Sequence, residues 1–115
     1  MGSMATSRTF VSSAEVKPAA QMSGVDRRTL VWGDQMLLAE MTIAKGTRVQ
    51  RHSHVHEQLG YLAKGRLEFV VGEERTVLEA GAGYRVPSNA PHEVYALEDS
   101  LVLDIFSPVR EEYLP

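Results

Sequence analysis

Residues 58–72, QLGYLAKGRLEFVVG, contain two short apolar runs that are separated by a Lys-Gly pair at residues 64–65. In the second run, Leu67, Phe69 and Val71 are spaced two apart, so they would share one face of a β-strand. A glycine between two such runs is typical of a turn between strands. The stretch therefore predicts two strands joined by a turn.

The same spacing continues on both sides of this stretch. From Thr29 onward the chain is a series of short apolar runs separated by glycine, proline and polar residues: TLVWG, QMLLAEMTI, RTVLEAG, GYRVP, HEVYAL and SLVLDIFSP. This pattern is typical of an all-β sandwich or barrel. A chain of 115 residues is long enough for one core and too short for two, so we expect a single domain.

The beginning of the chain does not follow this pattern. Residues 1–3 resemble a cloning scar before a start at Met4, and residues 4–28 are small, polar and weakly periodic. We predict an N-terminal arm over residues 4–28, with at most one short strand around residues 9–11. Residues 29–115 then form the barrel and a C-terminal tail.

Composition narrows the possible functions. The formal net charge is −3 and the charged residues are mixed, so the broad basic face that binds nucleic acid or anionic membranes is not expected. The chain has no cysteine, which leaves only nitrogen and oxygen ligands for any metal. Because neither a signal-peptide pattern nor an apolar run of membrane-spanning length is present, we expect a cytoplasmic protein.

Three of the four histidines lie within residues 51–60, RHSHVHEQLG. In a strand, His52 and His54 would point to the same side, so both imidazoles could reach one point. Taken alone, a His-x-His pair is more often a polar strand end that faces solvent. His92 follows a proline-rich turn ahead of another strand, which is a context that could bring a third imidazole to the same place.

The residues that follow leave two arrangements open. If the strand continues, His56 also faces inward; if the chain turns at His56-Glu57, Gln58 begins the next strand and can point at the same centre. His56 is then either an exposed turn residue or a contact at the mouth of a pocket. Glu57 is either a solvated rim residue or one that orients a ligand histidine.

Two motifs in this region resemble those of the cupin family. The first is Gly46, five residues, His52-Ser53-His54, three residues, Gln58, six residues and Gly65; the second is Gly81, five residues, Pro87-Ser88-Asn89, two residues and His92. The pair in this order is far more specific than either motif alone. The resemblance implies an RmlC-like, small single-domain cupin, which is a jelly-roll barrel, or double-stranded β-helix.

The resemblance also implies a metal site. Its ligands would be His52, His54 and His92, with Gln58 in the place where the family usually has a glutamate. A glutamine offers a neutral carbonyl oxygen, which leaves a bound divalent metal more Lewis-acidic. Imidazole nitrogens with one oxygen suit Mn, Fe, Ni, Co or Zn and do not choose among them.

The last strand places one carboxylate in an apolar setting. In LVLDIFSP, alternation puts Asp104 and Phe106 on one face, and this face is inward if the other packs elsewhere. A buried aspartate is either paired at the barrel mouth or used as a general acid or base. Phe106 is either plain core or pocket lining, and Arg110 is either a solvated tail residue or a bidentate partner for an anionic substrate.

The segments HSHVHEQ, PSNAPHEV and DIFSPVREEYL together resemble the KdgF-type pectin-degradation cupins. That resemblance implies a three-histidine, one-glutamine metal site and ring opening of 4,5-unsaturated uronates. It makes Asp104, Phe106 and Arg110 the functional residues beside the metal ligands, with no other cofactor and a small anionic carbohydrate as substrate.

Two other functions fit the same residues. A cupin dioxygenase would use Fe or Mn on these histidines and consume O₂, and a non-catalytic cupin would only bind a small molecule. Ring opening differs from a dioxygenase reaction because it is redox-neutral. It differs from simple binding because the substrate is converted to a product. We also expect a homodimer, which is usual for small cupins, with the apolar outer face of the last strand and the N-terminal arm as the available surface.

Overall fold

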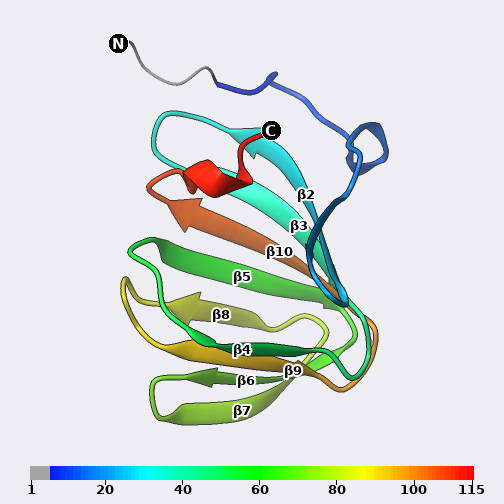
Figure 1. The fold of residues 1–115 in the computed structure, drawn as a ribbon, viewed down its shortest axis with the longest axis vertical. Helices are drawn as coiled ribbons and strands as arrows, with labels where there is room; N and C mark the ends of the chain where they lie inside the picture. Colours follow the sequence, from blue (N-terminus) through cyan, green and yellow to red (C-terminus); the bar gives the residue numbers. More distant parts are fainter. Residues whose placement is uncertain (1–5) are drawn as a thin grey trace.

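The computed structural model describes residues 6–115 and forms two antiparallel β-sheets that face each other (Figure 1). The larger sheet has the order β1 (Ala19–Met22), β2 (Val25–Trp32), β3 (Leu37–Ile43), β10 (Ser100–Ser107), β5 (Glu57–Lys64) and β8 (Gly83–Val86). The smaller has the order β4 (Arg48–His52), β9 (His92–Ala96), β6 (Arg66–Val71) and β7 (Glu74–Glu79). The predicted all-β jelly-roll barrel is confirmed.

The core lies between the two sheets. In β3 the buried residues alternate with partly exposed ones, so that Leu37, Ala39, Met41 and Ile43 all face the opposite sheet. The period of two gives this strand one buried face. The β5–β6 turn has the predicted glycine, Gly65, at φ +97°, a conformation that residues with a side chain rarely adopt.

The N-terminal arm is shorter than predicted. No strand forms around residues 9–11; instead a short 3-10 helix covers Ser13–Glu15, and β1 and the first part of β2, both in the larger sheet, lie within residues 4–28. All four residues of β1, an edge strand, are exposed, so it lacks the alternation that would reveal it in the sequence. The proposed scar at residues 1–3 lies outside the described residues.

Strand β10 occupies an inner position in the larger sheet, where it pairs with β3 on one side and β5 on the other. Beyond it the chain turns back at a cis Ser107-Pro108 bond and ends in a second 3-10 helix, Glu111–Tyr113. Tyr113 is buried, and its carbonyl accepts a hydrogen bond from Thr29 Oγ1 at 2.6 Å. The tail is thereby fixed against β2, across one end of the barrel (Figure 1).

Residues 6–115 contain no helix that is long and apolar enough to span a membrane.

Candidate metal centre

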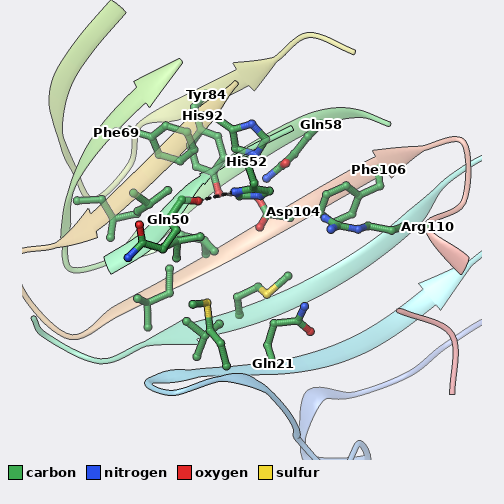
Figure 2. A pocket seen from close by; sticks show the side chains of 18 of the residues that line it. Gln21, Gln50, His52, Gln58, Phe69, Tyr84, His92, Asp104, Phe106 and Arg110 are labelled. Carbon is green, nitrogen blue, oxygen red and sulfur yellow. Dashed lines mark hydrogen bonds between the residues drawn. The ribbon is translucent and has the colours of Figure 1, made fainter. Parts of the chain in front are cut away.

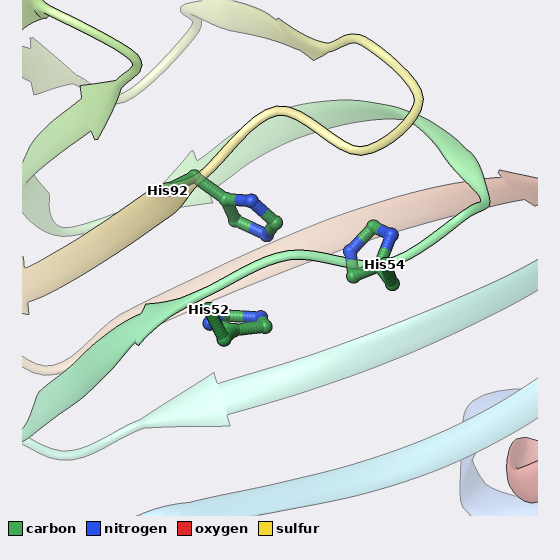
Figure 3. A group of neighbouring side chains, drawn as sticks. All are labelled: His52, His54 and His92. Atoms are coloured by element: carbon green, nitrogen blue, oxygen red, sulfur yellow. The ribbon is translucent and has the colours of Figure 1, made fainter.

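Three histidines from two strands and a loop meet inside one end of the barrel (Figure 3). His52 ends β4 and pairs in register with His92, the first residue of β9, while His54 lies in the loop between β4 and β5. One ring nitrogen from each lies within 4.8 Å of the others. Within residues 6–115, this is the one group of three or more histidine, cysteine, aspartate or glutamate residues with ligand atoms this close.

The loop after β8 holds the histidine loop in place. The backbone N–H of Asn89 donates to the carbonyl of His54 at 2.8 Å, and the Ser88 hydroxyl donates to the carbonyl of Val55. Asn89 has φ +65°, in the left-handed region that asparagine tolerates better than most residues. The two motif segments are therefore bonded directly to each other.

Hydrogen bonds to backbone carbonyls determine which nitrogen of each of the three rings carries the hydrogen. Nδ1 of His52 lies 2.8 Å from the carbonyl of Gln50, Nδ1 of His54 lies 2.9 Å from that of His56, and Nδ1 of His92 lies 2.9 Å from that of Ala90. Because a carbonyl only accepts, each Nδ1 must carry the proton. Each neutral ring then presents an Nε2 lone pair, which is the form that binds a metal.

The surroundings favour neutral histidines. The pKa of His92 is lowered to about 4, chiefly by burial; the hydrogen bond to the Ala90 carbonyl opposes this shift, and the charges of His52 and His54 add to it. Burial also lowers the pKa of His54, with the charge of Arg110 acting in the same direction. Near neutral pH these two rings need not lose a proton before they bind a cation.

Gln58, the second residue of β5, brings an oxygen to the same place. Its side chain is buried, and its Oε1 lies 3.1 Å from Nε2 of His54. With the His54 proton on Nδ1, both of these atoms are acceptors, so a cation that both can bind would stabilise the pair. Three imidazole nitrogens and one neutral oxygen are a donor set that fits a divalent transition metal.

Asp104 lies inside the barrel, on the inward face of β10 that the alternation indicated. It is 5% exposed and accepts a hydrogen bond from the Tyr84 hydroxyl at 2.5 Å. Burial raises the pKa of Asp104 to about 6, while hydrogen bonds from Tyr84 and Gln58 and the charge of Arg110 act in the opposite direction. The Gln58 amide therefore donates to Asp104 while its oxygen faces His54.

Arg110 and Phe106 lie side by side near Asp104 (Figure 2). The Arg110 guanidinium is 5.1 Å from the centre of the Phe106 ring and 4.3 Å from that of Tyr113, and its Nε donates to Glu112 at 3.0 Å. Only 13% of the Arg110 side chain is exposed. The tail thus holds this cation at the pocket, as bidentate recognition of an anion requires.

A cavity of about 280 Å³ joins these residues (Figure 2). Its polar wall includes His52, His92, Gln58, Asp104 and Arg110, and its apolar wall is formed by core residues of both sheets. This is a largely apolar cavity with a few convergent polar groups, as is usual for small-molecule sites.

A family model described as a cupin domain matches residues 39–106. The chain belongs to the cupin family. The curated relative "Pectin degradation protein KdgF" of Dickeya dadantii (strain 3937) is 34% identical over 93 residues, which cover 79% of this chain and 84% of that protein. The relationship therefore extends over most of both proteins.

Two solved structures have closely similar folds. An RmlC-like cupin from Shewanella frigidimarina NCIMB 400 superposes with a TM-score of 0.92 at 25% identity, covering 96% of this chain and 100% of that one. KdgF from Halomonas sp. superposes with a TM-score of 0.88 at 29% identity, covering 92% of this chain and 100% of that one. The predicted RmlC-like, KdgF-like relationship is confirmed.

The sequence left open whether the strand continues through His56 or the chain turns at His56-Glu57, and the structure has the turn. β5 begins at Glu57, which is exposed and paired with Ser107, and Gln58 is the inward residue. His56 lies outside the three-histidine group, with its ring 6.4 Å from that of Phe106 and edge-on to it. It is therefore close to the pocket without sharing the point where the other three rings meet.

Some residues that line the cavity of this cupin belong to no sequence motif that marks a site: Gln21, Met22, Gln50, Tyr84 and Tyr113. Gln21 and Met22 belong to the region that was predicted to be an arm. Tyr84 lies in GYRVP, a run that the alternation identified only as a strand. The role of the Gln50 carbonyl, which bonds to Nδ1 of His52, follows from the folded backbone and not from the residue type.

Proposed function

We propose that this cupin is a metal-dependent enzyme that opens the ring of 4,5-unsaturated uronates to a linear keto form. The observation that carries the proposal is a buried carboxylate, Asp104, and a held guanidinium, Arg110, in the cavity that His52 and His92 of the three-histidine group also line. The relative named as a pectin degradation protein supports a carbohydrate acid as substrate. Such a substrate needs a cation for its carboxylate and a group that moves protons.

The metal would be held by the three grouped histidines, His52, His54 and His92, and by Gln58, whose oxygen lies against His54. When bound, a divalent ion there supplies Lewis acidity that stabilises negative charge developing on a substrate oxygen. The donor set allows Mn, Fe, Ni, Co or Zn. We expect no further cofactor.

The reaction is an isomerisation in which protons only change place. The anomeric hydroxyl loses a proton, the C1–O5 bond breaks to give an aldehyde, and its electrons form an enolate over O5, C5 and C4. Protonation of C4 then gives the ketone. No oxidant or reductant is consumed, so the atoms of substrate and product balance.

In this proposal, Asp104 accepts the proton from the anomeric hydroxyl and returns one to C4. A carboxyl with a pKa of about 6 suits both steps near neutral pH, because it is neither a very weak base nor a very weak acid there. Arg110 binds the substrate carboxylate, and the ring of Phe106, which is buried against it, restricts where the sugar lies.

The test is the ultraviolet absorbance of a 4,5-unsaturated galacturonate, followed over time with purified protein of measured metal content. Wild type should accelerate loss of the conjugated alkene, and the D104N variant, with the same metal content, should fall to the rate of the blank. Wild-type protein that carries metal yet matches the blank would remove the uronate assignment. Oxygen uptake in a parallel electrode measurement would favour a dioxygenase instead, and ligand binding without either signal would favour a binding protein.

A further inference from the structure

Three residues that face the barrel interior lie next to one another across three strands of the larger sheet. Gly60 on β5 pairs in register with Asp104 on β10 and, on its other side, with Tyr84 on β8. Register partners in an antiparallel sheet point to the same side. The order across the sheet is therefore tyrosine, glycine, aspartate.

Gly60 provides the space that joins the outer two residues. A Cβ atom at position 60 would overlap the Tyr84 ring, and the nearest atoms include its hydroxyl oxygen. Neighbouring strands are about 4.8 Å apart, so the ring must pass over a whole strand to reach Asp104. Gly60 is not among the glycines with positive φ, so its missing side chain, and not its backbone conformation, is what the site uses.

The result is a carboxylate that is held from two directions. The Tyr84 hydroxyl donates to Oδ1 of Asp104 at 2.5 Å, and Gln58 donates to the same carboxylate. Tyr84 is fixed in turn by Phe69, with 4.4 Å between ring centres. Figure 2 shows Tyr84, Gln58 and Asp104 converging on one side of the cavity.

We propose that Tyr84 is a positioning residue, whose hydroxyl fixes the orientation of the Asp104 carboxylate toward the substrate, and that Gly60 is required for it to do so. This inference rests on the proposed function, in which Asp104 moves the protons. One carboxylate oxygen is bonded to Tyr84, which leaves the group a single orientation in which to meet the sugar. Without the hydroxyl, rotation about the Asp104 side chain would misplace the proton acceptor.

The test uses the Y84F variant, which keeps the ring and its contact with Phe69. We expect kcat to fall by a factor of about 10 to 100, as for a misplaced catalytic group. KM should stay within about threefold and the metal content should not change, because neither the Arg110 contact nor the histidines are altered. The matched control is Y95F, which removes an exposed hydroxyl from the outer face of β9 and should retain wild-type kcat.

A second variant, G60A, displaces the Tyr84 ring with the hydroxyl still present. Its kcat should fall as in Y84F, and the double variant should lose no more kcat than either single one, because both remove the same contact. The losses of thermal stability should instead accumulate, since the added methyl group still crowds the phenylalanine ring. Wild-type kcat in Y84F, or kcat losses that multiply in the double variant, would overturn the inference.

Crystal structures separate this inference from the proposed function. If wild type fails to convert the unsaturated uronate, the function is wrong, and the structure of Y84F still decides the role of Tyr84. A rotated Asp104 carboxylate in Y84F, beside an unchanged one in Y95F, supports the inference. A carboxylate in its wild-type orientation in Y84F overturns it.

Discussion

Gln58 stands where the cupin motif usually has a glutamate, and its two hydrogen-bonding ends give a physical reason. The oxygen faces His54 at 3.1 Å, while the amide donates to the buried Asp104 carboxylate. A glutamate could supply the oxygen and not the donor, and it would bring a second negative charge to Asp104. The glutamine thus connects the candidate metal centre to the candidate proton carrier.

This arrangement predicts that Q58E binds metal and loses turnover. The added carboxylate can still bind a cation, so metal content measured by plasma mass spectrometry should equal that of wild type or exceed it. We expect kcat to fall at least about 10-fold, because Asp104 loses a donor and gains a like charge. Turnover at the wild-type level would show that the Gln58 donor is not needed.

The histidine group predicts a sharp difference between a histidine inside the group and one outside it. H92A should weaken metal affinity by more than about 100-fold in a chelator competition assay, since even loss of a ligand's hydrogen-bond partner costs 10- to 100-fold. The control H56A removes the histidine that lies outside the group and should retain metal. Equal losses in the two variants would contradict the ligand assignment.

At the scale of elements, β1 is an exposed edge strand that nevertheless forms part of the cavity wall. Gln21 lines the cavity, its Oε1 accepts a hydrogen bond from Arg27, and its amide nitrogen is 3.5 Å from the Tyr113 hydroxyl. Segments from the two ends of the fold, β1 and the tail after β10, therefore meet beside the pocket.

This placement predicts that Gln21 contributes to substrate binding and not to the chemical step. Q21A should raise KM about 3- to 10-fold with kcat unchanged, which is the pattern of a lost contact that is equal in ground and transition states. The control is Q35A, which alters an exposed glutamine in the β2–β3 loop. A fall in kcat for Q21A at constant KM would be inconsistent with this role.

Alternation in a sequence reveals only those strands that have one buried and one exposed face. This explains which parts of the fold and the site could be predicted. The alternation in β6 put Phe69 on one face with Leu67, the alternation in β10 put Asp104 on one face with Phe106, and the motif spacing pointed to the histidines. The exposed strand β1 has no such pattern, so Gln21 was assigned to an arm. The contact of Tyr84 with Asp104 depends on a glycine in a third strand, and nothing in the local sequence of either residue reports it.

The whole molecule has an apolar surface on the outer side of the larger sheet. Leu59 and Tyr61 on β5 and Ile105 on β10 are each at least 40% exposed, and Leu59 is in register with Ile105. Adjacent exposed apolar side chains of this kind often mark a surface that a second subunit covers.

We therefore expect a homodimer that buries this surface. Light scattering after gel filtration should give twice the chain mass of 12.7 kDa, and the L59E variant should shift the species toward the monomer. The control V77E changes an exposed apolar residue on the smaller sheet and should leave the mass unaltered. A monomeric wild type would exclude the dimer.

The two walls of the cavity belong to strands with unequal protection against local unfolding. Asp104 lies on β10, whose amides are bonded on both sides, whereas Gln21 lies on β1, which has a neighbour on one side only. Opening free energies are smallest for such peripheral strands and largest at the centre of a sheet. Local opening is therefore expected at β1 before it reaches β10, so the cavity wall at Gln21 can move while the Asp104 carboxylate stays in place.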